Sequence, residues 1–114
     1  PKLKPPSKKK SQKATEEICV PLLSDIQLSK ITPDYNTKIA EKRVEQYAQK
    51  IVELADLQSS FTSVKKCVVL ALGDIVEGEL IFPGQSHLID ASLYSQVTVD
   101  GPRILYKYFS KTHC

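Results

Sequence analysis

Two aspartates, Asp25 and Asp74, stand at positions where a small α/β chain can carry chemistry. Asp25 comes shortly after an apolar run at residues 18–23, and Asp74 comes shortly after one at residues 67–72. Carboxylates at the carboxyl ends of neighbouring parallel strands lie at the edge where open α/β sheets bind ligands. Two such groups can share a hard divalent cation, whereas a lone strand-end aspartate is more typical of a turn. The pair therefore indicates a metal site, provided that both runs form adjacent strands.

The elements that must position these aspartates begin with a strand and a helix. Residues 18–23 predict the strand, and Pro21 places it at an edge or marks a local irregularity. Apolar side chains then recur at three- and four-residue spacing with charged residues between them. This pattern predicts an amphipathic helix that is capped by Asn36 or Thr37 and ends near Gln58.

The second half of the chain predicts another strand and further helices. Residues 66–72 contain an unbroken apolar row, which is typical of a parallel strand buried on both faces. Residues 73–85 form a long loop with three glycines, and loops of that length are often functional. A second helix should start near Ser86, and a final short helix should span residues 103–110. The second helix should point three apolar side chains inward, namely Ile89, Leu93 and Val97.

Positive charge is concentrated at the start of the chain. The 114 residues have a formal net charge of +3, but residues 1–13 alone contain six lysines and no acid. The rest of the chain is slightly acidic, with ten Lys or Arg against 13 Asp or Glu. Residues 1–15 are poor in apolar side chains, so we expect a basic flexible arm there and a folded domain over residues 16–114. Such an arm suits nucleic acid or a protein partner, and it is equally typical of a solubilising leader.

The three cysteines, Cys19, Cys67 and Cys114, indicate a reducing compartment. Their number is odd and no C-x-x-C pair occurs, which argues against a disulfide framework or a zinc ribbon. The apolar runs are far shorter than the about 20 residues that a membrane-spanning helix needs. We therefore expect a cytoplasmic protein with no membrane partner, in which Cys19 and Cys67 are buried in strands and inert.

Two segments resemble the calcineurin-like metallophosphoesterases, especially the phosphoesterase domains of bacteriophages. Residues 23–30 (LSDIQLSK) are similar to the family's D-x-H motif after its first strand, and residues 70–79 (LALGDIVEGE) to its G-D-x-x-D/E motif after the second. Residues 35–37 (YNT) and residues 81–85 (IFPGQ) add to the resemblance, which covers about residues 18–110. The implied fold is α/β: the β-α-β-α start of a metallophosphoesterase-type layered sheet, incomplete in this chain.

The resemblance implies a two-metal site that hydrolyses phosphate esters with Mn, Fe, Mg or Zn ions. Asp25 would ligate the first ion and Asp74 would bridge both, which holds such ions about 3.5–4 Å apart. Gln27 stands where the family has a histidine ligand, and an amide oxygen is a weaker donor to a transition metal than imidazole. The family's Asn-His motif and its later histidines have no counterpart, because His87 and His113 stand in other contexts.

These observations leave three interpretations. The first is the N-terminal part of a phosphoesterase, in the host cytoplasm if phage-encoded, that acts on phosphodiesters or phosphomonoesters, with nucleic acid favoured. The second is a non-catalytic α/β module that binds nucleic acid or a protein through residues 1–13, and the third is an unrelated α/β fold with structural acids. Because the chain starts at Pro1 and contains no methionine, we expect a fragment that needs a partner or a missing C-terminal half.

Overall fold

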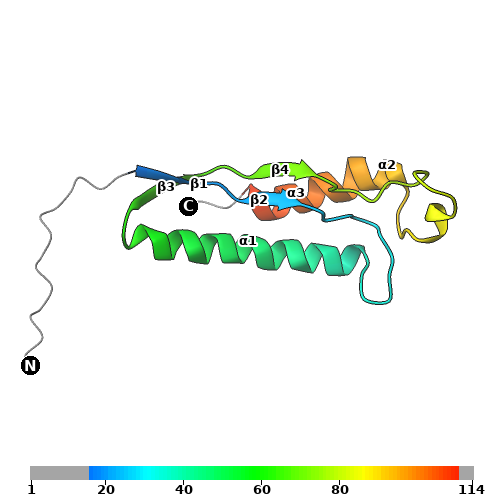
Figure 1. The fold of residues 1–114 in the computed structure, drawn as a ribbon, viewed down its shortest axis with the longest axis horizontal. Helices are drawn as coiled ribbons and strands as arrows, with labels where there is room; N and C mark the ends of the chain where they lie inside the picture. Colours follow the sequence, from blue (N-terminus) through cyan, green and yellow to red (C-terminus); the bar gives the residue numbers. More distant parts are fainter. Residues whose placement is uncertain (1–15, 111–114) are drawn as a thin grey trace, which may run out of the picture.

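The computed structural model describes residues 16–110, so the predictions for residues 1–15, His113 and Cys114 lie outside it. The described chain is a small α/β fold of four short parallel strands in two sheets, with two main helices (Figure 1). Its strands are β1 (Glu16–Cys19), β2 (Leu22–Ser24), β3 (Ser63–Cys67) and β4 (Leu70–Gly73). Its helices are α1 (Thr37–Ser59), the short α2 (Leu93–Ser95) and α3 (Gly101–Phe109), with a 3₁₀ turn η1 (Gln85–His87) and a π-helical turn η2 (Gln96–Asp100).

Each predicted strand is divided in two by a short break. Pro21 lies between β1 and β2, as expected for a residue with no amide N–H to donate to a ladder. Strand β1 pairs with β3 and β2 with β4, both in parallel, so α1 is the crossover of a β-α-β arrangement. The amides of Val68 and Leu70 donate to the carbonyls of Cys19 and Pro21, at 2.9 Å each. These two bonds keep the two halves of the chain paired across the break.

Helix α1 forms as its sequence pattern indicates, and its predicted bounds are confirmed to within one residue. Asn36 is the N-cap, and its side-chain oxygen accepts a hydrogen bond from the amide of Ile39 at 3.0 Å. The buried face consists of small and branched residues, namely Ala40, Val44, Ala48, Ile51 and Ala55. The outer face of α1 is charged, and among the described residues no helix is both long and apolar enough to cross a membrane.

The core lies between α1, α3 and the segment that follows β2. Leu28 and Ile104 are fully buried at its centre, with Leu23, Ile26, Ala40 and Val44 around them. The Phe109 ring packs edge-on against Tyr47, with 6.5 Å between the ring centroids. Leu105 and Tyr108 also pack on this cluster, so the aromatic end of α3 contributes to the core. Pro102 occupies the first turn of α3, where its missing N–H costs no hydrogen bond.

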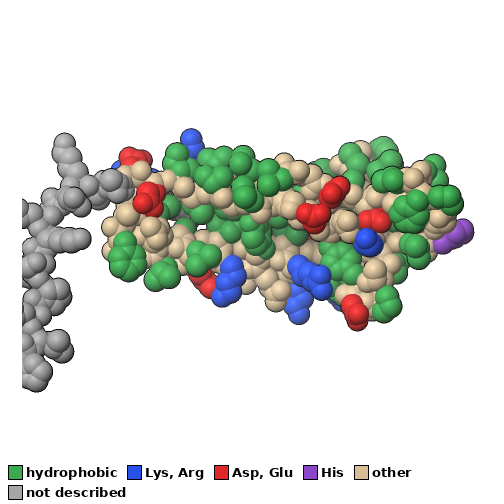
Figure 2. Space-filling view, viewed as in Figure 1, with side chains coloured by type: hydrophobic (Ala, Val, Ile, Leu, Met, Phe, Trp, Pro, Cys, Tyr) green, Lys and Arg blue, Asp and Glu red, His purple; other side chains and the backbone are tan. Residues whose placement is uncertain are grey.

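The prediction that the second strand is buried on both faces is wrong. All four residues of β4 are exposed, and Leu72 keeps 59% of its surface. The physical reason is that β4 has β2 along one edge, and no other strand of residues 16–110 lies along its second edge. Figure 2 shows hydrophobic side chains gathered along this sheet. The apolar row is therefore left uncovered by the described chain.

The prediction that Cys19 and Cys67 are buried is also wrong. Both cysteines are half-buried, because the two-stranded sheet of β1 and β3 leaves its edges open. They stand opposite each other in the register of the two strands.

The helix predicted from about Ser86 is wrong in its extent and in its buried face. Residues 85–87 form a single turn, and the next helical segment is the three-residue α2, which continues into η2. Leu93 and Val97 are exposed, whereas Gln96 is fully buried. The reason is that Gln96 enters the interior to bond the backbone of a loop, which turns the apolar side chains on either side of it outward.

Glu41 on α1 joins the two main helices. Its carboxylate accepts hydrogen bonds from both terminal nitrogens of Arg103 and from Nζ of Lys107, at 3.0 Å each. The Tyr108 hydroxyl donates a fourth at 3.2 Å. The bonds from Arg103, and next those from Lys107, lower the pKa of Glu41 to about 2. A charged Glu41 is therefore favoured by the folded state.

We expect Glu41→Gln to lower the free energy of unfolding by about 1 kcal/mol at neutral pH, because the network is largely solvent-exposed. Since the pKa of Glu41 is depressed on folding, its contribution is complete above pH 4.5 and is lost as the pH falls toward about 2. Urea denaturation at pH 7 and below pH 3 measures both effects. Glu53→Gln, which removes the exposed pair with Lys50, is the matched control. An equal loss in both variants, or a loss that does not shrink in acid, would contradict this role of Glu41.

Candidate metal site at the ends of β2 and β4

The two predicted metal ligands lie at neighbouring carboxyl ends of one parallel sheet. Ser24, the last residue of β2, pairs with Gly73, the last of β4. Asp25 and Asp74 are the next residues, and the Asp25 amide donates to the Gly73 carbonyl at 3.2 Å. One step further, the amide of Gln27 donates to the carbonyl of Asp74 at 2.9 Å. The backbone thus brings all three predicted ligands to one edge, while their role as ligands stays a prediction.

The backbone at this edge adopts a conformation that non-glycine residues rarely take. Asp25, Gln27, Ser29 and Asp74 have positive φ angles of 56°, 48°, 75° and 51°. Each costs about 1–2 kcal/mol relative to an ordinary conformation, with aspartate among the residues that tolerate it best. Backbone strain of this kind collects at functional sites, where the surrounding structure holds it in place. Here the ladder of β2 and β4 supplies that restraint.

The carboxylates of Asp25 and Asp74 are not engaged by the rest of the described chain. Both residues are exposed, and within residues 16–110 neither side chain takes part in a hydrogen bond or an ion pair. An aspartate that served only as a turn cap would accept a backbone N–H. Both carboxylates are therefore available to a ligand.

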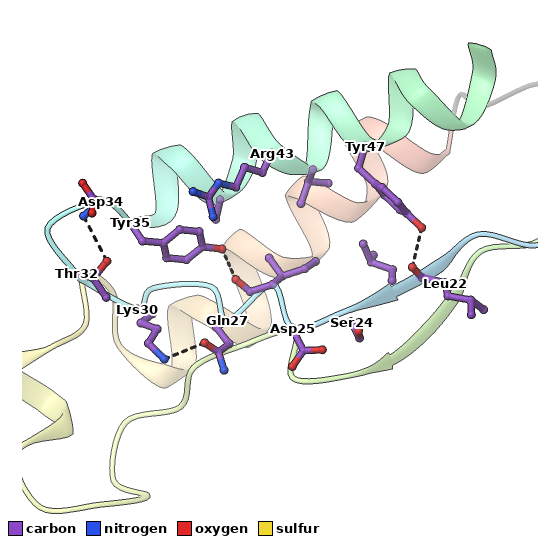
Figure 3. Close-up of a pocket in the computed structure, with 14 residues that line it drawn as sticks. Leu22, Ser24, Asp25, Gln27, Lys30, Thr32, Asp34, Tyr35, Arg43 and Tyr47 are labelled. Carbon is purple, nitrogen blue, oxygen red and sulfur yellow. Dashed lines mark hydrogen bonds between the residues drawn. The ribbon is translucent and has the colours of Figure 1, made fainter. Parts of the chain in front are cut away.

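The Gln27 side chain, in contrast, already has a cationic partner. Its amide oxygen accepts a hydrogen bond from Nζ of Lys30 at 2.9 Å. Figure 3 shows the two side chains directed toward each other. The same ammonium group lies 3.9 Å from a carboxylate oxygen of Glu77, which is mostly buried. Sequence reasoning did not single out Lys30, although its place three residues after Gln27 makes the contact possible.

A pocket of about 510 Å³ opens between this edge and the first turns of α1. Arg43 extends from α1 over the ring of Tyr35, with its guanidinium carbon 5.0 Å from the ring centroid (Figure 3). The Tyr35 hydroxyl donates to the Ile26 carbonyl, and burial raises the pKa of Tyr35 while the charge of Arg43 lowers it. The polar lining residues include Ser24, Asp25, Gln27, Lys30, Thr32, Asp34 and Tyr47. The pocket therefore combines positive charge, negative charge and aromatic surface.

Two buried glutamines hold the long loop that follows Asp74. Gln96 accepts from the Gly78 amide at 2.9 Å and donates to the Gly78 carbonyl at 3.0 Å. Gln85 accepts from the Ile81 amide at 2.7 Å and donates to the Glu77 carbonyl at 2.9 Å. The loop is thus shaped by side-chain bonds rather than by a strand or helix. The Pro-Gly-Gln sequence was the one signal for Gln85, and Gln96 had none.

Asp90 fixes the start of α1 from a distant part of the chain. Its carboxylate accepts from the amide of Thr37 at 2.8 Å and from the Thr37 hydroxyl at 2.5 Å. Burial raises the pKa of Asp90, but the hydrogen bonds that it accepts, first those from Thr37 and then one from Ser29, outweigh burial, so the pKa is lowered overall. A negative charge near the N-terminus of a helix is favourable because it complements the helix dipole. The first turn of α1 contains no acid of its own, so Asp90 supplies this charge. The bonds between Asp90 and Thr37 therefore help to position α1, which forms one wall of the pocket.

Comparisons of the chain with protein-family models, curated proteins and solved structures found no match. Within residues 16–110, no three His, Cys, Asp or Glu side chains come together in a group that can hold a metal ion. The candidate site therefore consists of two available carboxylates, one amide already bonded to an ammonium group, and the adjoining pocket.

We expect Gln96→Leu to lower the free energy of unfolding by about 2–4 kcal/mol, because it leaves both polar groups of Gly78 buried and unpaired. It also removes the donor to the Ala91 carbonyl. Urea denaturation measures the loss, and hydrogen exchange at the Gly78 amide should accelerate. Gln49→Leu, on the exposed face of α1, is the matched control and should change neither value. Equal stability of the two variants would contradict the bracing role.

Proposed function

We propose that this chain carries the first metal-binding motifs of a metal-dependent phosphoesterase of the calcineurin-like type. The supporting observation is the pair of Asp25 and Asp74 at matched ends of β2 and β4, with left-handed backbone and unengaged carboxylates. A structural role for these aspartates predicts the opposite, namely carboxylates bonded to nearby amides. The phosphoesterase interpretation is therefore favoured over that of purely structural acids.

The residues present fit a divalent cation in part. Asp25 and Asp74 supply hard oxygen donors, which suit Mg²⁺ and Mn²⁺ better than Zn²⁺ or other softer ions. Two carboxylates are too few for a closed site, and the described residues offer no third acidic, histidine or cysteine ligand beside them. We propose that a further part of the protein, or a partner, supplies the rest. When bound, such an ion would activate a water molecule and stabilise the negative charge on the phosphate oxygens.

The phosphate ester substrate is assigned to the pocket beside Asp25. Arg43 lies there on the face of Tyr35 and forms no ion pair with a described carboxylate. A planar guanidinium group held by stacking is well suited to bind two phosphate oxygens at once. The proposed substrates are phosphodiesters or phosphomonoesters, and Arg43 is proposed to orient them.

We expect the full chain to bind Mn²⁺ weakly, and Asp25→Asn or Asp74→Asn to weaken the affinity by about tenfold or more, since each removes a charged ligand. Titration followed by electron paramagnetic resonance measures free Mn²⁺ directly. Asp34→Asn, at an exposed aspartate that lines the pocket away from the strand ends, is the matched control and should bind as the unaltered chain does.

Hydrolysis of a generic phosphodiester by this chain should be slight, because the later histidine motifs of the family are missing. Rapid turnover that persists in Asp74→Asn would contradict the two-aspartate site, and so would equal Mn²⁺ affinity in Asp74→Asn and Asp34→Asn.

A second candidate function is nucleic-acid binding through residues 1–13. The observation that favours it is the six lysines in this segment, against a remainder that is slightly acidic. We propose that the arm attracts the phosphate backbone without reading sequence. Both proposed functions suit a cytoplasmic protein. The odd number of cysteines and the lack of a C-x-x-C pair support this proposed location, because they are typical of a reducing compartment.

Removal of residues 1–13 should weaken binding to a DNA duplex and reduce the slope of log affinity against log salt by about 5, if all six lysines meet phosphates. Fluorescence anisotropy across a salt series measures both quantities. Replacement of the six lysines by glutamine in the full-length chain separates charge from chain length and should have the same effect. An unchanged affinity and slope would contradict the contact.

A further inference from the structure

The last residues of β1 and β3, Cys19 and Cys67, form a cross-strand pair of thiols. They are partners in the register of the two parallel strands, and their sulfurs are not joined in the structure. We propose that this pair is a site of reversible oxidation, at which a small disulfide converts the two thiols into one cross-strand disulfide. This modification is independent of the proposed cation at Asp25 and Asp74 and of the arm at residues 1–13.

The backbone places the two cysteines within the reach of a disulfide. Neighbouring strands lie about 4.8 Å apart, and a disulfide joins Cα atoms that are about 4.4–6.8 Å apart. The amide of Val68 donates to the Cys19 carbonyl at 2.9 Å, which holds the chain after Cys67 against Cys19. Because this pair ends the two-stranded sheet, the two sulfurs can be joined by a local movement that leaves the rest of the ladder in place.

Both side chains lie on the face of the sheet that is turned toward α1. Successive side chains of a strand alternate between the two faces, so directly paired residues share one face. Cys19 lines a groove of about 310 Å³ whose lining also includes Leu54 and Ala55 of α1. Both cysteines are half-buried rather than enclosed, so a small disulfide in solution can reach them.

The oxidation is a thiol–disulfide exchange in two steps. The thiolate of one cysteine attacks a sulfur of the small disulfide, for which glutathione disulfide is the probe, and one small thiol leaves. The second cysteine then attacks the protein sulfur of the mixed disulfide, and the second small thiol leaves. Two electrons pass from the cysteine pair to the small disulfide, and the two released thiols carry the protons that the cysteines lose.

The disulfide would close a loop around α1 and support a part of the fold that has little core of its own. Residues 20–66, which lie between the two cysteines, contain the whole of α1. No residue of β1 or β3 is fully buried, whereas β2 contributes Leu23 to the core. A cross-link that closes a long loop stabilises the folded state. Oxidation should therefore stabilise the pairing of β1 with β3, and reduction should release it.

The test exposes the reduced full-length chain to glutathione disulfide, traps the remaining thiols with iodoacetamide and maps the products after trypsin digestion. The three cysteines fall in separate tryptic peptides, namely residues 14–30, 67–103 and 112–114, so mass spectrometry distinguishes the pairings. The same reaction in urea gives the pairing of the unfolded chain. Cys114→Ser is the matched control for Cys19→Ser and Cys67→Ser, and circular dichroism shows whether each variant keeps its helices.

We expect the link between Cys19 and Cys67, with the loss of two hydrogen atoms, as the main product in the folded unaltered chain and in Cys114→Ser. Cys19→Ser and Cys67→Ser should instead carry glutathione on the remaining cysteine of the pair. In urea the preference should disappear, and links to Cys114 should form as well. The urea midpoint of the oxidised chain should be raised, and dithiothreitol should return it to that of the reduced chain.

The proposal is overturned if the folded chain gives only glutathione adducts at Cys19 and Cys67, or if either cysteine is linked to Cys114 instead. It is also overturned if the folded chain and the chain in urea give the same products.

Discussion

The parallel pairing of β2 with β4 is the interaction on which the candidate site depends. The ladder ends at Ser24 and Gly73, so the backbones of the two aspartates that follow lie side by side. Hydrogen bonds between the two chains continue beyond the strands, from Gln27 to Asp74 and from Leu28 to Ile75 at 2.9 Å each. Because these bonds fix both backbones, the left-handed conformations at the aspartates are maintained without glycine. The pairing thus brings two motifs that are distant in the sequence to the same edge of the sheet.

The regions around this edge are held mainly by polar side chains that reach across the fold. Gln96 and Gln85 brace the loop after β4, and Asp90 anchors the start of α1. Glu41 joins α1 to α3. A small core of short strands buries little apolar surface, so satisfied polar bonds carry a large share of its specificity. The apolar face of β4 is left uncovered by the described residues.

Sequence patterns predicted the parts of the fold whose signal is local. The apolar spacing defined α1 almost to the residue, and the strand-end rule placed Asp25 and Asp74. The apolar row before Asp74 was misleading, because its burial depends on strands and layers that the described chain does not supply. Gln96 and Lys30 were missed for a related reason, since their roles arise from contacts that only the folded backbone creates. Gln27 lies at the same edge as the two aspartates, but its bond to Lys30 could not be foreseen from the sequence.

The central proposal is that the ends of β2 and β4 bind a divalent cation through Asp25 and Asp74. Anomalous diffraction from crystals grown with Mn²⁺ locates such an ion directly, without dependence on activity. We expect an anomalous peak at coordination distance from both aspartate carboxylates. No peak at the strand ends at saturating Mn²⁺ would contradict the proposal.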